Sequence, residues 1–270
     1  MGAKKAGNLD DGAIQSAAMR SAILFFPAVL TLACGSDEVP PKEVPSPAQV
    51  RSYFGINTDS CFRYAYSAGG ATVYARISYT GPNMTSIAGK TVFVRAYSKE
   101  SGGLPEEWFL NTESNGQVRL LRSTEGQGGS RITRRYETEP QPLFAELVFD
   151  KMNQPGVAVG DRFEVEATPK ACIGNGDCTD APTEKHTWTV LALDRMVTTP
   201  EGQVPAVELE YRVQAGADAP RVSTYSLVPG KGIAKFTDFT GTLHQVCAWR
   251  TCDAAGACTG AASCNDLICN

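Results

Sequence analysis

The chain has 270 residues, a formal net charge of −4 at pH 7 and a sequence pI of about 5.4. Its hydrophobic fraction of 42% and charged fraction of 20% are those of a folded globular protein and exclude a wholly disordered chain. The mild acidity and the absence of a long Lys/Arg block exclude a general electrostatic attraction to nucleic acid, so we expect no nucleic-acid partner.

A short apolar segment near the N-terminus is typical of a signal peptide. Met19-Arg20 supplies a start and a positive charge, and residues 21–33 are mostly apolar. This run is shorter than the about 20 residues that a transmembrane helix needs. We therefore predict a signal region over residues 1–33. Residues 1–18 do not fit the pattern, which favours Met19 as the true first residue, and a long charged leader is the alternative.

The signal region ends in a motif around a cysteine, Thr31-Leu32-Ala33-Cys34, which resembles the lipobox of bacterial lipoproteins. In that family the cysteine is diacylated, for example with palmitate, and the chain is cut just before it. The resemblance implies that lipid on Cys34 anchors the protein to a membrane of the cell envelope. Gly35 in place of aspartate implies the outer membrane. The family usually has leucine where this chain has Thr31, and an ordinary secretory cut after Ala33 is the competing interpretation.

The number of cysteines agrees with a lipidated Cys34. Nine is an odd number for an exported protein, and setting Cys34 aside leaves eight, which can pair completely. An ordinary cut would leave Cys34 as a surplus thiol. The disulfide candidates are Cys61, Cys172, Cys178, Cys247, Cys252, Cys258, Cys264 and Cys269.

A tether and then a β domain are expected to follow the lipidated cysteine. Residues 34–52 contain four prolines among charged residues, which predicts an extended tether. From residue 53 to 246 apolar residues recur with a period of two, as in antiparallel strands with one buried face. The alternating positions are Val73, Ala75, Ile77 and Tyr79; Val92, Val94 and Ala96; Leu143, Ala145, Leu147 and Phe149; and Val207, Leu209, Tyr211 and Val213.

Some basic residues of these strands are expected to face solvent. Arg95 alternates with the valines and the alanine of its run, which places it on the wet face. The cluster Arg131, Arg134 and Arg135 is short and acidic residues follow it, so we expect it on the solvated face of a strand.

Turn signals separate the strand-like runs, and Asn115-Gly116 is the best hairpin signal because a type I′ turn needs positive φ at both central residues. Outside the signal region no window shows a long helical apolar stripe. We therefore predict a mainly β fold: an antiparallel curved sheet that forms a half-barrel, a barrel or a sandwich, with a small disulfide-rich C-terminal tail.

The tail, residues 247–270, has few apolar residues with which to build a core. Five cysteines lie in it, so one is expected to pair elsewhere, with Cys61 as the natural candidate, while Cys172 and Cys178 can close a small loop. Each crosslink is expected to contribute about 2–4 kcal/mol. We expect no zinc or other metal site, because no Cys-x-x-Cys pair occurs and the expected compartment is oxidising.

No motif for catalysis stands out, and we expect neither an enzyme nor a cofactor. The only histidines are His186 and His244; no Gly-x-Ser-x-Gly elbow and no phosphate-binding loop occurs. His186 precedes an apolar run at 187–193 and is expected at the surface or at a strand edge. His244 lies in a polar–apolar alternation just before the tail.

The second half carries three short motifs: Val-Gly-Asp at 159–161, Val-Pro-Ala at 204–206, and a segment from Tyr225 through Pro229-Gly230 to Phe236. Across residues 90–237, they resemble a group of uncharacterised periplasmic β-rich proteins related to the half-barrels of lipoprotein carriers. The resemblance implies a half-barrel fold and no catalytic residue. The family usually has a Pro-Ala-Gly segment near residues 204–206, which this chain lacks.

We therefore expect a noncatalytic, lipid-anchored envelope protein that binds an apolar ligand or an envelope protein. The concave face of a curved sheet can hold an apolar ligand. Alternatively, the same aromatic residues simply belong to the core. Two other hypotheses are a surface module that binds through the tail and an enzyme of unknown class. The candidate liners of the concave face are Phe144, Phe149, Phe163, Trp188 and Tyr211.

Overall fold

The computed structural model describes residues 54–57, 59–82, 86–112, 118–137, 141–142, 158–174, 176–253 and 255–269. The chain divides into two units, Met1–Lys42 and Glu43–Asn270, and all of these residues belong to the second. The predicted signal region, Cys34 and the predicted tether lie outside the described residues. None of the helices in the described ranges is both long and apolar enough to span a bilayer.

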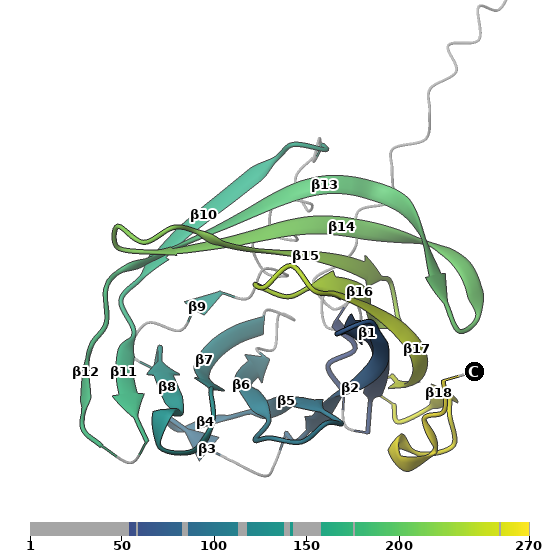
Figure 1. Cartoon of the computed structure of the whole chain (residues 1–270), viewed down its shortest axis with the longest axis horizontal. Coiled ribbons are helices and arrows are strands. Elements are labelled where there is room, and N and C mark those ends of the chain that lie inside the picture. The colour runs from purple at the N-terminus through teal and green to yellow at the C-terminus, as the bar shows by residue number, and fades with distance from the viewer. Residues whose placement is uncertain are drawn as a thin grey trace, which may run out of the picture. The chain divides into compact units, whose positions relative to one another are not determined.

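The described residues fold mainly into β-strands, as the period of two predicts (Figure 1). Two short 3₁₀ helices, η1 (Gly128–Ser130) and η2 (Cys264–Asp266), accompany them. The strands are β1 (Cys61–Ala68), β2 (Ala71–Thr80), β3 (Ser86–Ile87), β4 (Lys90–Thr91), β5 (Phe93–Lys99), β6 (Glu106–Thr112), β7 (Val118–Glu125), β8 (Ile132–Arg135), β9 (Gln141–Pro142), β10 (Arg162–Ala167), β11 (Lys170–Ile173), β12 (Cys178–Asp180), β13 (Glu184–Thr199), β14 (Gly202–Ala215), β15 (Arg221–Val228), β16 (Gly232–Thr237), β17 (Leu243–Cys252) and β18 (Cys258–Gly260).

Within the described residues, sixteen strands form one antiparallel sheet. Its order is β10-β13-β14-β15-β16-β17-β1-β2-β5-β6-β7-β8-β11-β12, with β18 beside β17 and β9 beside β7. Strands β3 and β4 form a separate ribbon. In this part of the chain the end strands β10 and β12 do not pair with each other, so the sheet is curved but not closed. The predicted antiparallel curved sheet is confirmed.

Strand β1 joins the two halves of this sheet. Its residue Cys61 pairs with Ser78 of β2 on one side and with Arg250 of β17 on the other. As a result, β13 and β14 arch over one side of the curve while β5, β6 and β7 line the opposite side (Figure 1). The core fills the space between them and takes side chains from both halves, among them Tyr64 of β1 and Leu209 of β14.

Strand β5 turns the opposite face inward from the one that the sequence predicts. Phe93, Arg95 and Tyr97 are only 3%, 7% and 8% exposed, whereas Val94 and Ala96 are half-buried. The two aromatic side chains offer more apolar area for burial than valine and alanine. Because the side-chain period of a strand is two, the register that buries them also carries Arg95 inward. The prediction of a solvated Arg95 is therefore wrong.

The cysteine-rich tail begins inside the sheet. Cys247 and Cys252 belong to β17, so the predicted boundary at residue 247 falls within a strand. Cys172 and Cys178 join the β11–β12 hairpin, and Cys61 of β1 is bonded to a tail cysteine. The four disulfides are Cys61–Cys264, Cys172–Cys178, Cys247–Cys269 and Cys252–Cys258.

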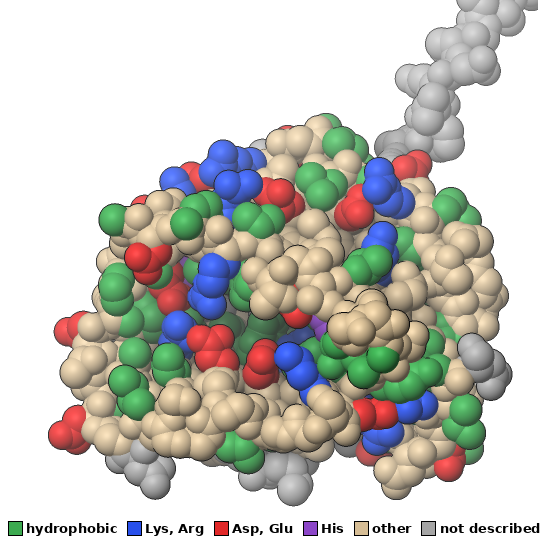
Figure 2. All heavy atoms as spheres, in the orientation of Figure 1, with side chains coloured by type: hydrophobic (Ala, Val, Ile, Leu, Met, Phe, Trp, Pro, Cys, Tyr) green, Lys and Arg blue, Asp and Glu red, His purple; other side chains and the backbone are tan. Residues whose placement is uncertain are grey.

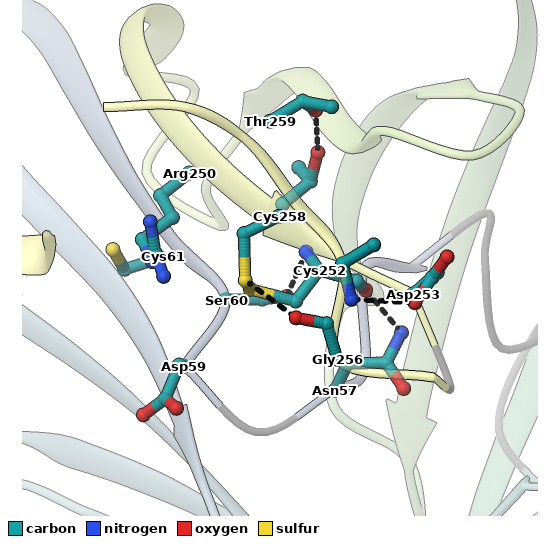
Figure 3. Close-up of a disulfide and its surroundings, with 12 residues drawn as sticks. Asn57, Asp59, Ser60, Cys61, Arg250, Cys252, Asp253, Gly256, Cys258 and Thr259 are labelled. Carbon is teal, nitrogen blue, oxygen red and sulfur yellow. Dashed lines mark hydrogen bonds between the residues drawn. A yellow bond between two sulfur atoms is a disulfide. The ribbon is translucent and has the colours of Figure 1, made fainter. Parts of the chain in front are cut away.

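The Cys252–Cys258 disulfide joins β17 and β18 next to the segment that precedes β1 (Figure 3). The backbone N–H of Cys252 donates to Ser60 Oγ at 3.0 Å, and Asn57 Nδ2 donates to the Cys252 carbonyl at 2.6 Å. Leu267 packs beside Cys61 in a small separate cluster. The tail is thus ordered by crosslinks, hydrogen bonds and contacts with the sheet.

We predict that the disulfides contribute unequally to stability. Replacing both Cys61 and Cys264 with alanine should lower the free energy of unfolding by about 5 kcal/mol, and replacing Cys172 and Cys178 by about 2 kcal/mol. The reason is chain entropy, since the first bond spans 203 residues of sequence and the second only 6. Equilibrium unfolding in guanidinium chloride measures both losses. Equal losses would contradict a mainly entropic contribution.

Candidate functional site

The concave face of the sheet carries a group of polar side chains inside a mostly apolar core. Figure 2 shows a hollow in the face of the molecule that is turned toward the viewer. Acidic and basic side chains gather around this hollow, hydrophobic side chains lie deeper in it, and a histidine is visible within. The buried polar side chains described next, and the aromatic side chains in contact with them, come from β1, β5, β6, β16 and β17.

His244 of β17 lies among aromatic rings on the concave face. Its ring stacks on Phe236 at a centroid distance of 4.4 Å and lies 4.6 Å from Tyr66 and 5.9 Å from Tyr97. The side chain is 0% exposed, and its Nε2 lies 3.3 Å from Asp238 Oδ2. A carboxylate only accepts, so we assign the ring proton to Nε2, which makes Nδ1 an acceptor in the neutral ring. His244 Nδ1 has no hydrogen-bond partner.

The protonation of this pair follows from its surroundings. Burial lowers the pKa of His244, and the hydrogen bond and charge of Asp238 oppose that shift only in part. Burial would raise the pKa of Asp238, but hydrogen bonds from Thr240 and Thr242 and the contact with His244 hold it below its usual value. At neutral pH the pair is therefore a carboxylate beside a neutral imidazole.

Arg95 of β5 is a buried cation that forms no ion pair with the residues that the structure describes. Its guanidinium carbon lies 4.5 Å from the ring centroid of Trp108 on β6. Burial raises the pKa of Tyr64, Tyr79 and Tyr97, to about 12 for Tyr79, and the nearby charge of Arg95 opposes this rise. Two polar atoms here, Arg95 Nε and Tyr97 Oη, have no hydrogen-bond partner.

A second polar cluster joins β8 to β13, two strands that lie far apart in the sheet order. Glu184 accepts a hydrogen bond from the Tyr136 hydroxyl at 2.8 Å, and its other oxygen lies 3.1 Å from Arg134 Nε. His186 Nε2 lies 3.3 Å from Glu184, and His186 Nδ1 lies 2.6 Å from Tyr211 Oη. Burial would raise the pKa of Glu184, but hydrogen bonds from His186 and Tyr136 hold it below its usual value.

Two expectations about this cluster are wrong. His186 is buried within β13 at 3% exposure, because Tyr211 and Glu184 provide polar contacts for its ring in the interior. Arg134 is not on a solvated face but pairs with Glu184 and Glu125. Of the other two arginines of the predicted basic cluster, Arg131 is half-buried and pairs with Glu107, and Arg135 keeps an exposed side chain.

The structure brings together two of the five predicted liners of the concave face. The rings of Trp188 and Tyr211 stack at a centroid distance of 3.6 Å. Trp188 is 2% exposed and belongs to the main core, against which Tyr211 packs. The strand that contains Phe163 is described but its side chain is not, and Phe144 and Phe149 lie outside the described residues.

A separate cavity of about 440 Å³ lies beside the Cys252–Cys258 disulfide. Its charged lining residues, Asp59 and Asp253, are both acidic. One carboxylate oxygen of Asp253 accepts hydrogen bonds from the backbone N–H groups of Ala255 and Ala257, as in a turn. Among the described residues no group of three His, Cys, Asp or Glu side chains could hold a metal ion.

No protein-family model matches the chain, and no curated protein matches it either. Two solved structures resemble it and cover 72% of this chain and 96% of their own. One is a candidate exported protein with a YmcC-like fold from Bacteroides fragilis, with 11% identity and a TM-score of 0.39. The other is a candidate lipoprotein from Parabacteroides distasonis, with 12% identity and a TM-score of 0.35. Likenesses of this size assign no family and transfer no function.

We predict that Glu184 makes stability depend on acid pH. Replacing Glu184 with glutamine should lower the free energy of unfolding at pH 7 by about 1–3 kcal/mol, because buried hydrogen bonds to a charged acceptor weaken. The folded-state pKa of Glu184 is lowered, so its contribution is full above its unfolded pKa of about 4.3 and is lost as pH falls through the folded value.

The gap between wild type and Glu184→Gln should therefore narrow below about pH 4.3. Denaturant unfolding of both proteins between pH 3 and pH 7 measures this gap. A gap that stays constant over the whole range would show that Glu184 does not titrate as described.

Proposed function

We propose that this chain is a lipid-anchored protein of the bacterial cell envelope that binds a ligand, without catalysis, on the concave face of its sheet. The observation that carries the proposal is the set of buried polar atoms without hydrogen-bond partners on that face, in Arg95, Tyr97 and His244. If this face served only as core, each such atom would lower the free energy of unfolding by about 1–3 kcal/mol. A ligand that forms hydrogen bonds with these atoms would remove this loss of stability.

The envelope location rests on independent features of the chain. The motif around Cys34 resembles a lipobox, and the eight other cysteines form four disulfides, which are typical of an oxidising compartment. Gly35, rather than aspartate, favours the outer membrane by resemblance to the lipoprotein family.

The noncatalytic part of the proposal rests on the setting of the two histidines. His186 and His244 are 3% and 0% exposed. Their polar ring contacts are with Tyr211 and Glu184 for the first and with Asp238 for the second. Neither arrangement places an exposed base beside a serine or cysteine nucleophile.

We predict that Tyr66→Ala weakens the binding of the neutral apolar probe N-phenyl-1-naphthylamine to the mature protein by about 2- to 12-fold, since an aromatic contact contributes about 0.5–1.5 kcal/mol. Tyr66 packs against the core beside His244. The matched control is Tyr74→Ala on β2, whose ring lies under Arg63, and it should leave the affinity unchanged. Probe fluorescence during titration measures the dissociation constants.

A second candidate function is a surface module that binds a protein through the tail. The observation in its favour is Ile268, which is 70% exposed next to the buried Leu267. Deleting residues 247–270 would remove residues 247–252 of the 10-residue strand β17, so a point variant is the better test. In the probe titration, Ile268→Ser should behave as wild type. A loss of probe binding in Ile268→Ser or Tyr74→Ala, but not in Tyr66→Ala, would contradict binding on the concave face.

We also predict that Cys34→Ser releases the protein from membranes. The variant lacks the thiol that carries the lipid, so it should not incorporate radiolabelled palmitate and should appear in the soluble envelope fraction. Fractionation and labelling in a host that processes lipoproteins measure both properties. Unchanged membrane attachment and labelling in Cys34→Ser would rule out the proposed anchor.

A further inference from the structure

We infer that the ligand of the concave face is an amphiphile with an anionic head group of the carboxylate class, and that Arg95 is the cation that binds this head group. The inference rests on the proposed binding function and adds the chemistry of the ligand. It starts from Arg95, which is 7% exposed and whose Nε lacks a hydrogen-bond partner. A guanidinium stays charged at any physiological pH.

Buried charges in folded proteins are normally paired, because an unpaired charge loses its hydration without compensation. Another partly buried arginine shows the usual solution, since Arg134 pairs with both Glu125 and Glu184. Arg95 has no such partner among the described residues. An anion that enters from outside the chain would supply it.

The geometry of Arg95 fits a planar anion. Its guanidinium lies over the ring of Trp108, so one face of the planar group is covered by the indole. A side-chain hydrogen bond joins Arg95 to Tyr79, while the Nε–H, which lies in the guanidinium plane, lacks a partner and can donate to a carboxylate oxygen. Tyr97, two residues along β5 on the same face, adds a hydroxyl without a hydrogen-bond partner that can donate to the same anion.

Glu106 opposes an anion at this position. It pairs with Tyr97 in the β5–β6 register. Burial raises the pKa of Glu106, and the charge of Arg95 works against that rise. A ligand anion and Glu106 therefore compete for the same cation. Removing the charge of Glu106 should favour the ligand.

The apolar part of the ligand follows from what surrounds Arg95. The main core contributes Tyr225 and Phe236, whose rings stack at a centroid distance of 6.2 Å, and burial raises the pKa of Tyr225 while the charge of Arg95 opposes this rise. Hydrophobic side chains also form the deeper part of the hollow in Figure 2. A free small anion would leave the hydrophobic side chains of this hollow exposed to water, whereas an alkyl chain would cover them.

The test is isothermal titration of the mature protein with four probes: octanoate, 1-octanol, octylamine and acetate. Octanoate should bind at least about tenfold more tightly than 1-octanol and octylamine, since hydrogen bonds to a charged group are worth about 1.5–3 kcal/mol. Arg95→Met should remove this preference by weakening octanoate alone. Glu106→Gln should strengthen octanoate binding. The control Arg162→Met, whose side chain on β10 is 57% exposed, should change nothing.

The melting temperature separates a binding role of Arg95 from a structural one. Without ligand, Arg95→Met should melt at the same temperature as wild type or higher, because an unpaired buried charge is replaced by an apolar side chain of similar length. Octanoate should raise the melting temperature of wild type and not that of the variant. A marked loss of melting temperature in ligand-free Arg95→Met would assign Arg95 to the fold and overturn the inference.

The probes also separate this inference from the proposed function. Equal affinities for octanoate, 1-octanol and octylamine would overturn the anionic head group and leave binding on the concave face intact. Acetate binding as tight as that of octanoate would overturn the amphiphile. If no probe binds to wild type, both the inference and the proposed function are contradicted.

Discussion

Strand β1 is hydrogen-bonded along both edges, and the concave face depends on this double pairing. On one edge β1 forms a hairpin with β2, and on the other it pairs with β17, which lies near the opposite end of the chain. The Tyr64 hydroxyl on the same strand donates to the Ile233 carbonyl of β16 at 2.7 Å. Cys61 at its start is bonded to Cys264 of the tail. If β1 left this position, the two halves of the sheet would share no strand.

The curvature that follows brings side chains from distant strands together inside the sheet. His244 of β17 reaches Tyr97 of β5, with β1 and β2 between their strands in the sheet order. At another place Glu184 of β13 meets Tyr136 and Arg134 near β8, so side chains link strands that backbone pairing does not join. Both polar clusters are therefore products of the same curved sheet. The Glu184 carboxylate accepts a hydrogen bond from Tyr136 and pairs with Arg134. Buried polar atoms without hydrogen-bond partners occur in both clusters: His186 Nε2 in this one, and Arg95 Nε, Tyr97 Oη and His244 Nδ1 in the other.

The sequence predicts the type of structure well because the period of two is a local property. The alternating apolar residues that end at Val213 predict strand β14. The odd number of cysteines in the tail predicts a bond between the tail and Cys61. When both faces of a strand carry apolar residues, the period of two does not decide which face turns toward the core. Strand β5 is such a case, and Arg95 between two aromatic residues is the signal that could have indicated it.

The candidate site itself depends on pairings between distant segments, which a single sequence does not reveal. Trp108 lies next to Arg95 only because β6 follows β5 in that register, and His186 is buried only because Tyr211 and Glu184 lie beside it. Of the predicted aromatic liners, Trp188 belongs to the core, so the polar residues carry more information about binding than the aromatic ones. Composition and spacing gave no reason to group Arg95, Tyr97 and His244.

Photo-crosslinking would show directly where a bound ligand lies on the sheet. The mature protein would be irradiated with a fatty acid that carries a diazirine on its alkyl chain, and the labelled residues would be mapped by mass spectrometry of peptides. Binding on the concave face should place the labels on inward-facing residues of β1, β5, β6 and β17, and unlabelled fatty acid should prevent this labelling by competition. Labels confined to the tail at residues 255–269 or to outward-facing residues would contradict it.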